Sequence, residues 1–330
     1  MKRNMVKARD AVGALTTVDD GVDGSAIYLY GEGWDFGEVQ GGKRGLNATQ
    51  LTMAGTGIGT FNDRIRDAVR GGSAFSDRRE QGFATGLYYD PSGYNRAGAG
   101  ELNKLLESAD RIRVGLTGNL RSYRFQDHGG RMTTGGQFAN VGYAAEPREA
   151  ITYVSAHDNE TFFDKIQFAA PSGATIDERL RMQMMGASIT ALSQGIPFFH
   201  AGVDMLRSKS MDADSYNSGD HFNRLDWSYE MNNFGVGLPP AEKNRDRWSI
   251  MAPILAREDI TPGKDEIVAM HAHVRAMLEV RKSSPLFRLR SADDVMARVE
   301  FHNTGRDQTP GVIAMSVSDA VDGLPDLDPK

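Results

Sequence analysis

The spacing of apolar side chains divides the chain into predicted helices and strands separated by Gly-rich polar loops. Residues 1–15 carry apolar side chains at Met1, Met5, Ala8, Val12 and Leu15, the spacing of one helix face. No residue before this segment could serve as its N-cap, so we expect the sequence to start inside a domain. The same spacing predicts further helices over residues 65–69, 102–109, 182–192 and 267–278.

Short apolar runs predict strands, and those without polar alternation are expected to be buried on both faces. These runs cover residues 26–30, 57–61, 151–154 and 196–199. Strands that alternate with loops and helices indicate parallel βα units. Two long polar stretches, residues 71–100 and 207–248, are predicted to be loops.

The order of these elements predicts an α/β protein that contains about half of a (β/α)₈ TIM barrel over residues 1–285. A complete barrel needs eight strands and about 250 residues, whereas only four strands are predicted here. Near the C-terminus, Val295, Ala297, Val299 and Phe301 alternate with other residues, and residues 311–317 form a second β run. We therefore expect residues 286–330 to begin an all-β sandwich domain that is truncated after its first hairpin.

Composition narrows the classes of partner. Of the 330 residues, 40% are hydrophobic and 25% charged, and the net charge of −6 is not typical of a nucleic-acid-binding protein. The absence of Cys excludes disulfides and Cys-ligated metals but leaves the cellular compartment open. Residues 1–15 lack the apolar core of a secretory signal, and polar residues within the uncharged stretch 182–203 argue against a membrane span.

The first predicted strand ends in a carboxylate between two glycines, Glu32, followed at once by Trp34 and Phe36. Flanking glycines allow a ligand or another backbone to approach closely. A carboxyl group against aromatic surface is partly desolvated, which raises its pKa and suits a general acid. On residue type alone, an exposed loop Glu beside a core Trp remains the alternative.

The third predicted strand ends in four polar residues, His157-Asp158-Asn159-Glu160, which is not the composition of a packed core. Asp158 or Asn159 could instead cap a helix. A metal site would lack a second His at zinc-binding spacing, and a serine triad would lack its G-x-S-x-G elbow. Two carboxylates at the C-terminal ends of barrel strands, together with aromatic residues, suit glycoside hydrolysis.

Both segments resemble motifs of the pullulanase and limit-dextrinase branch of the α-amylase family. Residues 30–39 (Tyr-Gly-Glu-Gly-Trp-Asp-Phe-Gly-Glu-Val) resemble its general-acid motif, and residues 153–161 (Tyr-Val-Ser-Ala-His-Asp-Asn-Glu-Thr) its last catalytic motif. Similar stretches follow in the same order at residues 55–64, 194–202, 206–210, 222–226 and 283–287. The resemblance spans essentially the whole chain and places residues 1–285 in the region of barrel strands 5–8.

The resemblance implies a retaining α-1,6-glucosidase that acts on branched α-glucans such as pullulan, limit dextrin and amylopectin. It implies that Glu32 is the general acid/base and Asp158 the transition-state stabiliser. Substrate contacts are expected from His157, Asn159, Trp34 and Phe36.

One expected catalytic group is missing from the sequence. The family's nucleophilic Asp lies in an Asp-Gly-Phe-Arg-Phe-Asp-like motif, and no such motif occurs in the chain. A retaining mechanism without its nucleophile forms no glycosyl-enzyme, so we expect a fragment that is inactive alone. The alternatives are a non-catalytic α-glucan-binding protein, or another debranching activity of the α-amylase family such as isoamylase-like action.

Weaker patterns lie between residues 207 and 248. The acidic residues 212–220 do not follow the EF-hand pattern, so calcium is considered but no ligand set or other cofactor is predicted. Asp246 lies near Trp248, a pairing that could line a sugar subsite or serve an ordinary turn. Structural pairing with nearby carboxylates is predicted for Arg207, Lys209 and Arg224.

Overall fold

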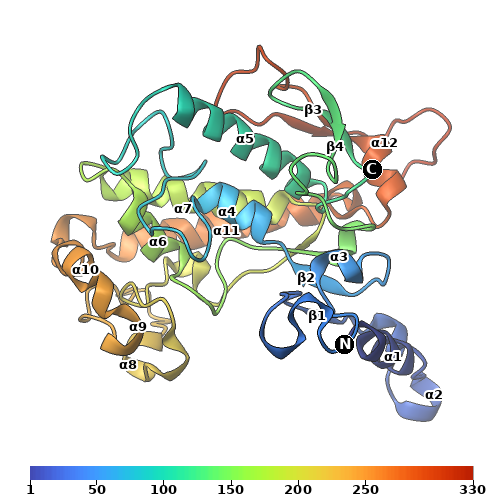
Figure 1. Cartoon of the computed structure of the whole chain (residues 1–330), viewed down its shortest axis with the longest axis horizontal. Helices are drawn as coiled ribbons and strands as arrows, with labels where there is room; N and C mark the ends of the chain where they lie inside the picture. The colour runs from blue at the N-terminus through green and yellow to red at the C-terminus, as the bar shows by residue number, and fades with distance from the viewer. Residues whose placement is uncertain (330) are drawn as a thin grey trace.

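The computed structural model describes residues 1–329 (Figure 1), and the largest sheet among them has four parallel strands. Its strands follow one another in space in the order β1 (Tyr30–Gly31), β2 (Gly59–Phe61), β5 (Ala150–Thr152) and β6 (Ile196–Pro197). Because all three pairings are parallel, the C-terminal ends of the strands lie along the same edge. The predicted α/β class is confirmed; closure as half of a barrel stays a prediction.

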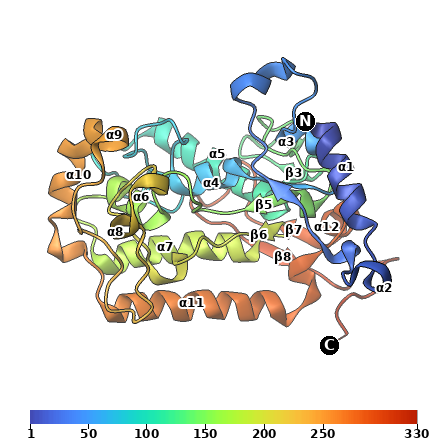
Figure 2. The ribbon, with the colours of Figure 1, turned by 90° about the horizontal axis from the view of Figure 1, so that it is seen from below.

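Long helices connect and flank these strands. Figure 2 shows α7 and α11 running side by side, while α4 packs against α5. The long helices are α1 (Lys2–Gly13), α4 (Asp63–Arg70), α5 (Ala99–Leu116), α6 (Phe162–Ala169), α7 (Ile176–Leu192), α10 (Trp248–Leu255) and α11 (Lys264–Ser283). No helix of the described residues is long and apolar enough to cross a membrane.

Local sequence signals explain where the helices begin. Asn62 accepts a hydrogen bond from the amide of Ile65 at the start of α4, and Thr161 caps α6 in the same way. A capping box between Thr175 and Glu178 begins α7. The predicted helices over 65–69, 102–109, 182–192 and 267–278 are therefore confirmed.

Shorter elements occupy the remaining segments. The stretch 207–248, predicted to be loop, contains two short helices because its polar residues support isolated turns. The short helices are α2 (Thr17–Asp20), α3 (Gln50–Met53), α8 (Asp220–Asn223), α9 (Ala241–Asn244) and α12 (Ala292–Arg298). Two hairpins add β3 (Arg124–Gln126) with β4 (Met132–Thr134), and β7 (Val299–Phe301) with β8 (Met315–Val317).

The first predicted strand is shorter and more exposed than expected. A 3₁₀ turn, η1 (Gly24–Ala26), occupies its start, since the side chain of Asp23 accepts a hydrogen bond from the amide of Ser25. Ile27 is 42% exposed and Tyr30 50% exposed. Burial on both faces was therefore the wrong prediction: β1 is an edge strand whose pairing in the described sheet is with β2.

The C-terminal hairpin is confirmed, but its first strand begins later than predicted. Val295 lies in α12, which Ser291 caps by accepting a hydrogen bond from the amide of Asp294. Val295 and Val299 are four positions apart. This spacing fits one turn of a helix, and it also fits one face of a strand, on which every second residue lies. Both are buried in the same cluster as Ile112 of α5, so this segment shares its core with the helices. A separate β-sandwich domain from residue 286 stays a prediction.

The apolar spacing predicts that α7 buries Met182, Met185, Ile189 and Leu192, but the residues that are fully buried lie beside this face. Met185 is 41% exposed, whereas Gly186 and Ala187 are buried. A Cβ atom at Gly186 would overlap the ring of Phe162 on α6, so small side chains allow the two helices to approach closely. Close packing here depends on residue size rather than on hydrophobicity.

Candidate active site

A cleft of about 650 Å³ opens at the C-terminal ends of β1, β2 and β5. The volume is within the usual range for small-molecule sites. Two loops provide most of the predicted site residues: the β1 loop (residues 32–49) and the β5 loop (residues 154–160). The predicted residues that line the cleft are Glu32, Trp34, Phe36, His157, Asp158 and Asn159.

Three of these side chains form a polar cluster that joins the two loops. The Nε2 atom of His157 lies 3.0 Å from Oε1 of Glu32 and 3.6 Å from Oδ1 of Asp158. His157 and Asp158 are each 61% exposed, and Glu32 is 36% exposed. All three groups can therefore meet a ligand in the cleft.

The local backbone explains how Glu32 reaches this position. Gly33 adopts a φ of +77°, and a Cβ atom there would lie 2.8 Å from the side chain of Thr60 on β2. Only glycine fits this close approach in a left-handed conformation. The amide of Phe61 also donates to the carbonyl of Glu32 at 3.3 Å, which extends the β1–β2 pairing to the acid itself.

Aromatic rings line the cleft beside Glu32. Trp34 packs edge-on against Phe61, with ring centroids 6.4 Å apart. Phe36 is 65% exposed, so its ring is available to a ligand. Such rings stack on the apolar faces of sugars as they do on other flat ligands.

The β1 loop is organised by one of its own carboxylates. Asp35 accepts a hydrogen bond from Nδ2 of Asn47 at 2.8 Å and from the amide of Gly41 at 3.1 Å. The bond from Asn47, followed by that from Gly41, lowers the pKa of Asp35 below its ordinary value. Both bonds are made within the loop itself.

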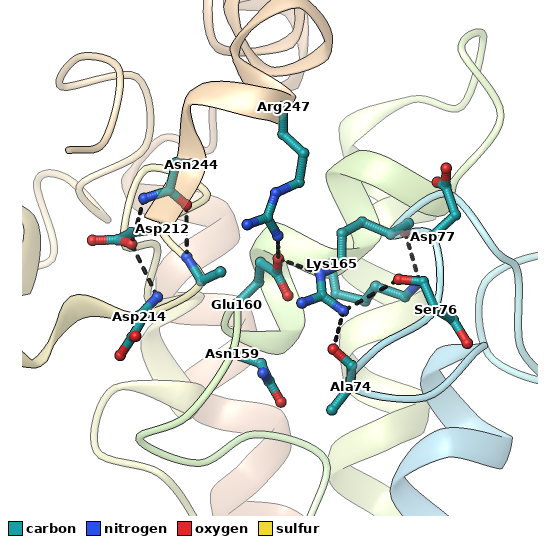
Figure 3. Close-up of polar contacts among 12 residues, drawn as sticks. Ala74, Ser76, Asp77, Asn159, Glu160, Lys165, Asp212, Asp214, Asn244 and Arg247 are labelled. Carbon is teal, nitrogen blue, oxygen red and sulfur yellow. Dashed lines mark hydrogen bonds and ion pairs between the residues drawn. The ribbon is translucent and has the colours of Figure 1, made fainter. Parts of the chain in front are cut away.

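The β5 loop is instead held by cations from other elements. Arg70, at the end of α4, donates to the carbonyls of Val154 (3.0 Å) and Glu160 (2.9 Å). The Glu160 carboxylate is 1% exposed and lies 2.7 Å from Nε of Arg78 and 3.5 Å from Nη1 of Arg247. Figure 3 shows the Arg247 side chain extending from its helical turn toward Glu160. No spacing in the sequence indicates that these groups meet.

The predicted pairing of Arg207 and Lys209 with carboxylates is wrong, because both side chains mainly satisfy backbone carbonyls. Lys209 Nζ donates to the carbonyls of His157 at 3.3 Å and Asn159 at 2.7 Å. Arg207 donates to the carbonyls of Ala201 and Asn223. Buried carbonyls at strand ends have to be paired, and a long cation reaches them.

A neutral histidine supports the start of the β5 loop. Burial, followed by the charge of Arg207, lowers the pKa of His200 to about 3. Arg207 approaches Nε2 of His200 at 3.1 Å and can only donate, so the proton of the neutral ring is on Nδ1. That nitrogen lies 3.4 Å from Oγ of Ser155, which also accepts from the amide of Phe162.

The acidic stretch 212–220 is organised around Asp212, which is fully buried. Its carboxylate accepts hydrogen bonds from the amide of Asp214 and from Nδ2 of Asn244 (Figure 3). It also accepts one from Ser218 Oγ. Protein donors therefore occupy the oxygens that a cation would need. Calcium, which the sequence analysis considers without a ligand set, is not tested by these contacts. Glu32, His157 and Asp158 are the one metal-compatible group among the described residues.

Asp246 is not brought together with the other predicted residues. Its side chain is 77% exposed, lies 3.5 Å from Nε of Arg247, and is not part of the cleft lining. The short 3₁₀ turn η6 (Arg245–Arg247) directs Arg247 inward and Asp246 outward. Proximity to Trp248 in sequence therefore did not predict a place in the site.

Several charged residues that sequence reasoning missed also line the cleft. Asp63 and Arg66 belong to the first turn of α4, directly after β2, which lies between β1 and β5. Parallel strand order could have indicated these two. The others come from long loops and carry no such signal: Arg78, Asp214, Lys243 and Arg247.

Comparison with known proteins identifies relatives over the length of the chain. The family described as alpha-1,6-glucosidases, pullulanase-type, C-terminal, matches residues 229–330. Pullulanase 1, chloroplastic, of Arabidopsis thaliana is 49% identical over 99% of this chain and 34% of its own length. A pullulanase of Klebsiella aerogenes is 40% identical over 89% of the chain and 27% of its own length. The chain thus spans about a third of these relatives.

Solved structures give the same result. An apo pullulanase from Klebsiella pneumoniae matches 99% of this chain and 35% of its own, with a TM-score of 0.90 and 38% identity. A maltotriose complex of the Klebsiella pneumoniae protein has the same TM-score and identity over 34% of its length. A maltotetraose complex of a Paenibacillus barengoltzii pullulanase matches 98% of the chain and 37% of its own, with a TM-score of 0.65 and 26% identity.

Proposed function

Over the length that it spans, the chain belongs to the pullulanase family, and we propose that it supplies the general acid/base and the transition-state stabiliser of an α-1,6-glucosidase. The substrates would be branched α-glucans such as pullulan, limit dextrin and amylopectin. The observation that supports this most is the meeting of Glu32, His157 and Asp158 in one cleft, from two loops more than 100 residues apart.

Glu32 would act first as the acid. Its carboxyl group donates a proton to the glycosidic oxygen as the bond to the sugar breaks, and then removes a proton from the incoming water. Its partner in the structure is Nε2 of His157 at 3.0 Å, so a bound sugar would have to take the place of this contact. His157 is exposed enough to turn toward a sugar hydroxyl.

Asp158 would stabilise the oxocarbenium-like transition state. A carboxylate 3.6 Å from His157 can accept hydrogen bonds from sugar hydroxyls, and such bonds strengthen as charge develops on the ring. Trp34 and Phe36 would stack against the neighbouring sugar. The mechanism uses no cofactor.

The remaining catalytic group would come from outside this sequence. No Asp-Gly-Phe-Arg-Phe-Asp-like motif is present, and the retaining mechanism requires a nucleophilic carboxylate. The four parallel strands would then be half of a (β/α)₈ barrel completed by the polypeptide that carries this group. By itself the chain would not hydrolyse pullulan.

A chimaera tests this proposal. The chain is joined behind the preceding part of the Arabidopsis thaliana relative, with which it shares 49% identity. Release of reducing ends from pullulan is expected from the chimaera and not from the chain alone. Glu32→Gln in the chimaera should lower turnover by at least about 100-fold, because the proton donor is lost.

The matched control is Glu38→Gln, which changes a carboxylate that pairs with Arg44 in the β1 loop outside the cleft lining. This variant should retain turnover. Near-normal activity of Glu32→Gln would contradict the acid assignment. A chain that binds maltotriose while its chimaera stays inactive would favour a non-catalytic glucan-binding protein, and cleavage of amylopectin but not pullulan would favour isoamylase-like action.

A further inference from the structure

The β5 loop has exposed functional side chains on a buried backbone. Val154, Ser155 and Ala156 are buried, whereas His157 and Asp158 are each 61% exposed. The next residue, Asn159, adopts a φ of +63°, in the left-handed region. A non-glycine residue keeps this conformation only where its surroundings support it.

Lys209 contacts the loop on both sides of Asp158. Its ammonium donates to the carbonyl of the residue before, His157 (3.3 Å), and of the residue after, Asn159 (2.7 Å). The Lys209 side chain is 1% exposed. The His157 carbonyl belongs to the peptide that precedes Asp158, and the Asn159 carbonyl to the peptide that follows Asn159. The two bonds therefore hold both ends of the Asp158-Asn159 pair, and with them the direction in which Asp158 leaves the backbone.

Lys209 is itself anchored to the helix that follows the loop. Its amide donates to Oδ2 of Asp164 at 2.7 Å, and the hydroxyl of Ser208 donates to the other oxygen. Asp164 lies in the first turn of α6, which begins just after the β5 loop. Burial lowers the pKa of Lys209, and the charge of Asp164 opposes this. Lys209 is thus bonded both to the β5 loop and to α6, the helix that directly follows this loop.

Arg70 fixes the two ends of the same loop. It joins the carbonyls of Val154 and Glu160, so the β5 loop is held at both ends by Arg70 and at its centre by Lys209. The contacts come from α4 and from the segment after β6, which lie on opposite sides of β5 in the sheet order. Lys209 contacts the peptide that precedes Asp158 and the peptide that follows Asn159.

We propose that Lys209 is a positioning residue that sets the direction of the Asp158 carboxylate and the His157 ring toward Glu32. The role of Asp158 in this statement rests on the proposed function, whereas the geometry of the loop does not. Loss of the ammonium would leave the carbonyls of His157 and Asn159 without this donor and allow the two peptide planes to rotate. A small displacement of a binding carboxylate is costly, because glucan contacts depend on its exact placement.

Histidine NMR of the whole chain tests the geometry directly. The chain has seven histidines, and the signal of His157 is assigned with His157→Gln. In the wild type, Glu32→Gln should shift this signal, since Nε2 lies 3.0 Å from Oε1. In Lys209→Met, the His157 signal should move, and it should no longer respond to Glu32→Gln. An unchanged response in Lys209→Met would overturn the proposal.

Arg179→Met is the matched control for a purely structural effect. Arg179 is 1% exposed and donates to the carbonyls of Pro171 and Ala174, in the connection between α6 and α7. This variant also removes a buried cation from backbone carbonyls and should lower stability. The coupling between His157 and Glu32 should nevertheless persist. If Arg179→Met abolished it as well, a specific role of Lys209 would be excluded.

The absence of cysteine allows the ammonium to be restored chemically. Lys209→Cys, alkylated in urea with 2-bromoethylamine and refolded, carries an ammonium at the length of lysine. The propyl derivative has a similar length without charge, and the wild type passes through the same cycle. The aminoethyl form should recover the response of His157, and the propyl form should not. Equal recovery by both would assign the effect to packing.

Maltotriose titration of the same samples separates the geometry from the proposed function. Its dissociation constant should rise about tenfold or more in Lys209→Met and return in the aminoethyl form. A wild type without maltotriose response would contradict the glucan assignment and leave the coupling of His157 to Glu32 as the test of positioning. Should the variants not fold, the ammonium protons of Lys209 in the wild type decide: exchange as fast as in exposed lysines overturns the proposal, and protection supports it.

Discussion

The two loops that meet in the cleft are held in place by different means. The β1 loop follows an edge strand and depends on Asp35, which contacts Asn47 and Gly41 within the same loop. The β5 loop follows a central strand, and cations from two other parts of the chain bind its carbonyls. The contacts of Asp35 are therefore local, whereas those that hold the β5 loop come from elements far away in the sequence.

This difference corresponds to the proposed roles of the two carboxylates. An acid that gives and receives a proton, Glu32, has to exchange its contact with His157 for contacts with a substrate. A stabiliser such as Asp158 works best when its direction is set before the ligand arrives. Four predictions test this contrast between a local and a long-range support, in order of decreasing effect.

The largest effect is expected from Arg70→Met. Burial lowers the pKa of Arg70 to about 10, and its removal leaves the carbonyls of Val154 and Glu160 unpaired. Each buried unpaired carbonyl costs about 1–3 kcal/mol, so the free energy of unfolding should fall by about 3 kcal/mol or more. Urea unfolding measures this change. Arg79→Met, which removes a 39% exposed arginine paired with Asp77, should change it by less than about 1 kcal/mol. Equal losses would contradict the contrast.

The next effect is a pH dependence that arises from Lys165, which is buried and donates to the carbonyls of Arg78 and Glu80. Burial, followed by the charge of Arg70, lowers its pKa from 10.5 to about 7. Between these values the unfolded chain holds a proton that the folded chain has released, so stability should rise with pH. The slope from pH 7 to 9 is expected to be about 1 kcal/mol per pH unit and to flatten in Lys165→Met. Stability that falls over this range in the wild type would contradict the assignment.

A smaller and local effect is expected from Asp35→Ala. Hydrogen exchange of the Gly41 amide should accelerate, because its acceptor is lost, while exchange in the β5 loop stays unchanged. The lowered pKa of Asp35 means that the ionised form supports the loop above 3.8, and that this support is lost as pH falls through the folded value. Acceleration in both loops would show that they are mechanically coupled.

The smallest effect is expected from Asp246→Ala, because this exposed side chain lies outside the cleft lining. The melting temperature should stay within about 2 °C of the wild type, and maltotriose affinity within about twofold. Arg247→Ala serves as the comparison, since it removes a partner of Glu160 one position further along. A loss of maltotriose affinity in Asp246→Ala as large as in Arg247→Ala would show that Asp246 contributes to ligand binding.

Sequence periodicity predicted the four strands of the sheet and the helices α1, α4, α5, α7 and α11, because burial of one face leaves a regular apolar pattern, but it missed α6 and α10. Periodicity failed at β1, where the apolar run did not distinguish an edge strand from a central one. It also failed at Val295, where the spacing of a strand face is the same as that of one helical turn. The two motifs located Glu32 and the His157-Asp158 pair. Asp246, two positions before Trp248, lies outside the cleft because one position along a 3₁₀ turn reverses the direction of a side chain.

The sequence by itself determined the candidate residues Glu32, His157 and Asp158 and the strand ends on which they lie, since those signals are local: a run of apolar residues, a carboxylate between two glycines, a cluster of polar residues after a strand. The tertiary structure alone decided how the groups are held. Lys209 lies 52 positions from the carbonyl of His157, and Arg70 lies 90 positions from that of Glu160. Backbone carbonyls are the same at every position and leave no pattern in the sequence, so only the folded chain shows which of them a buried cation pairs with.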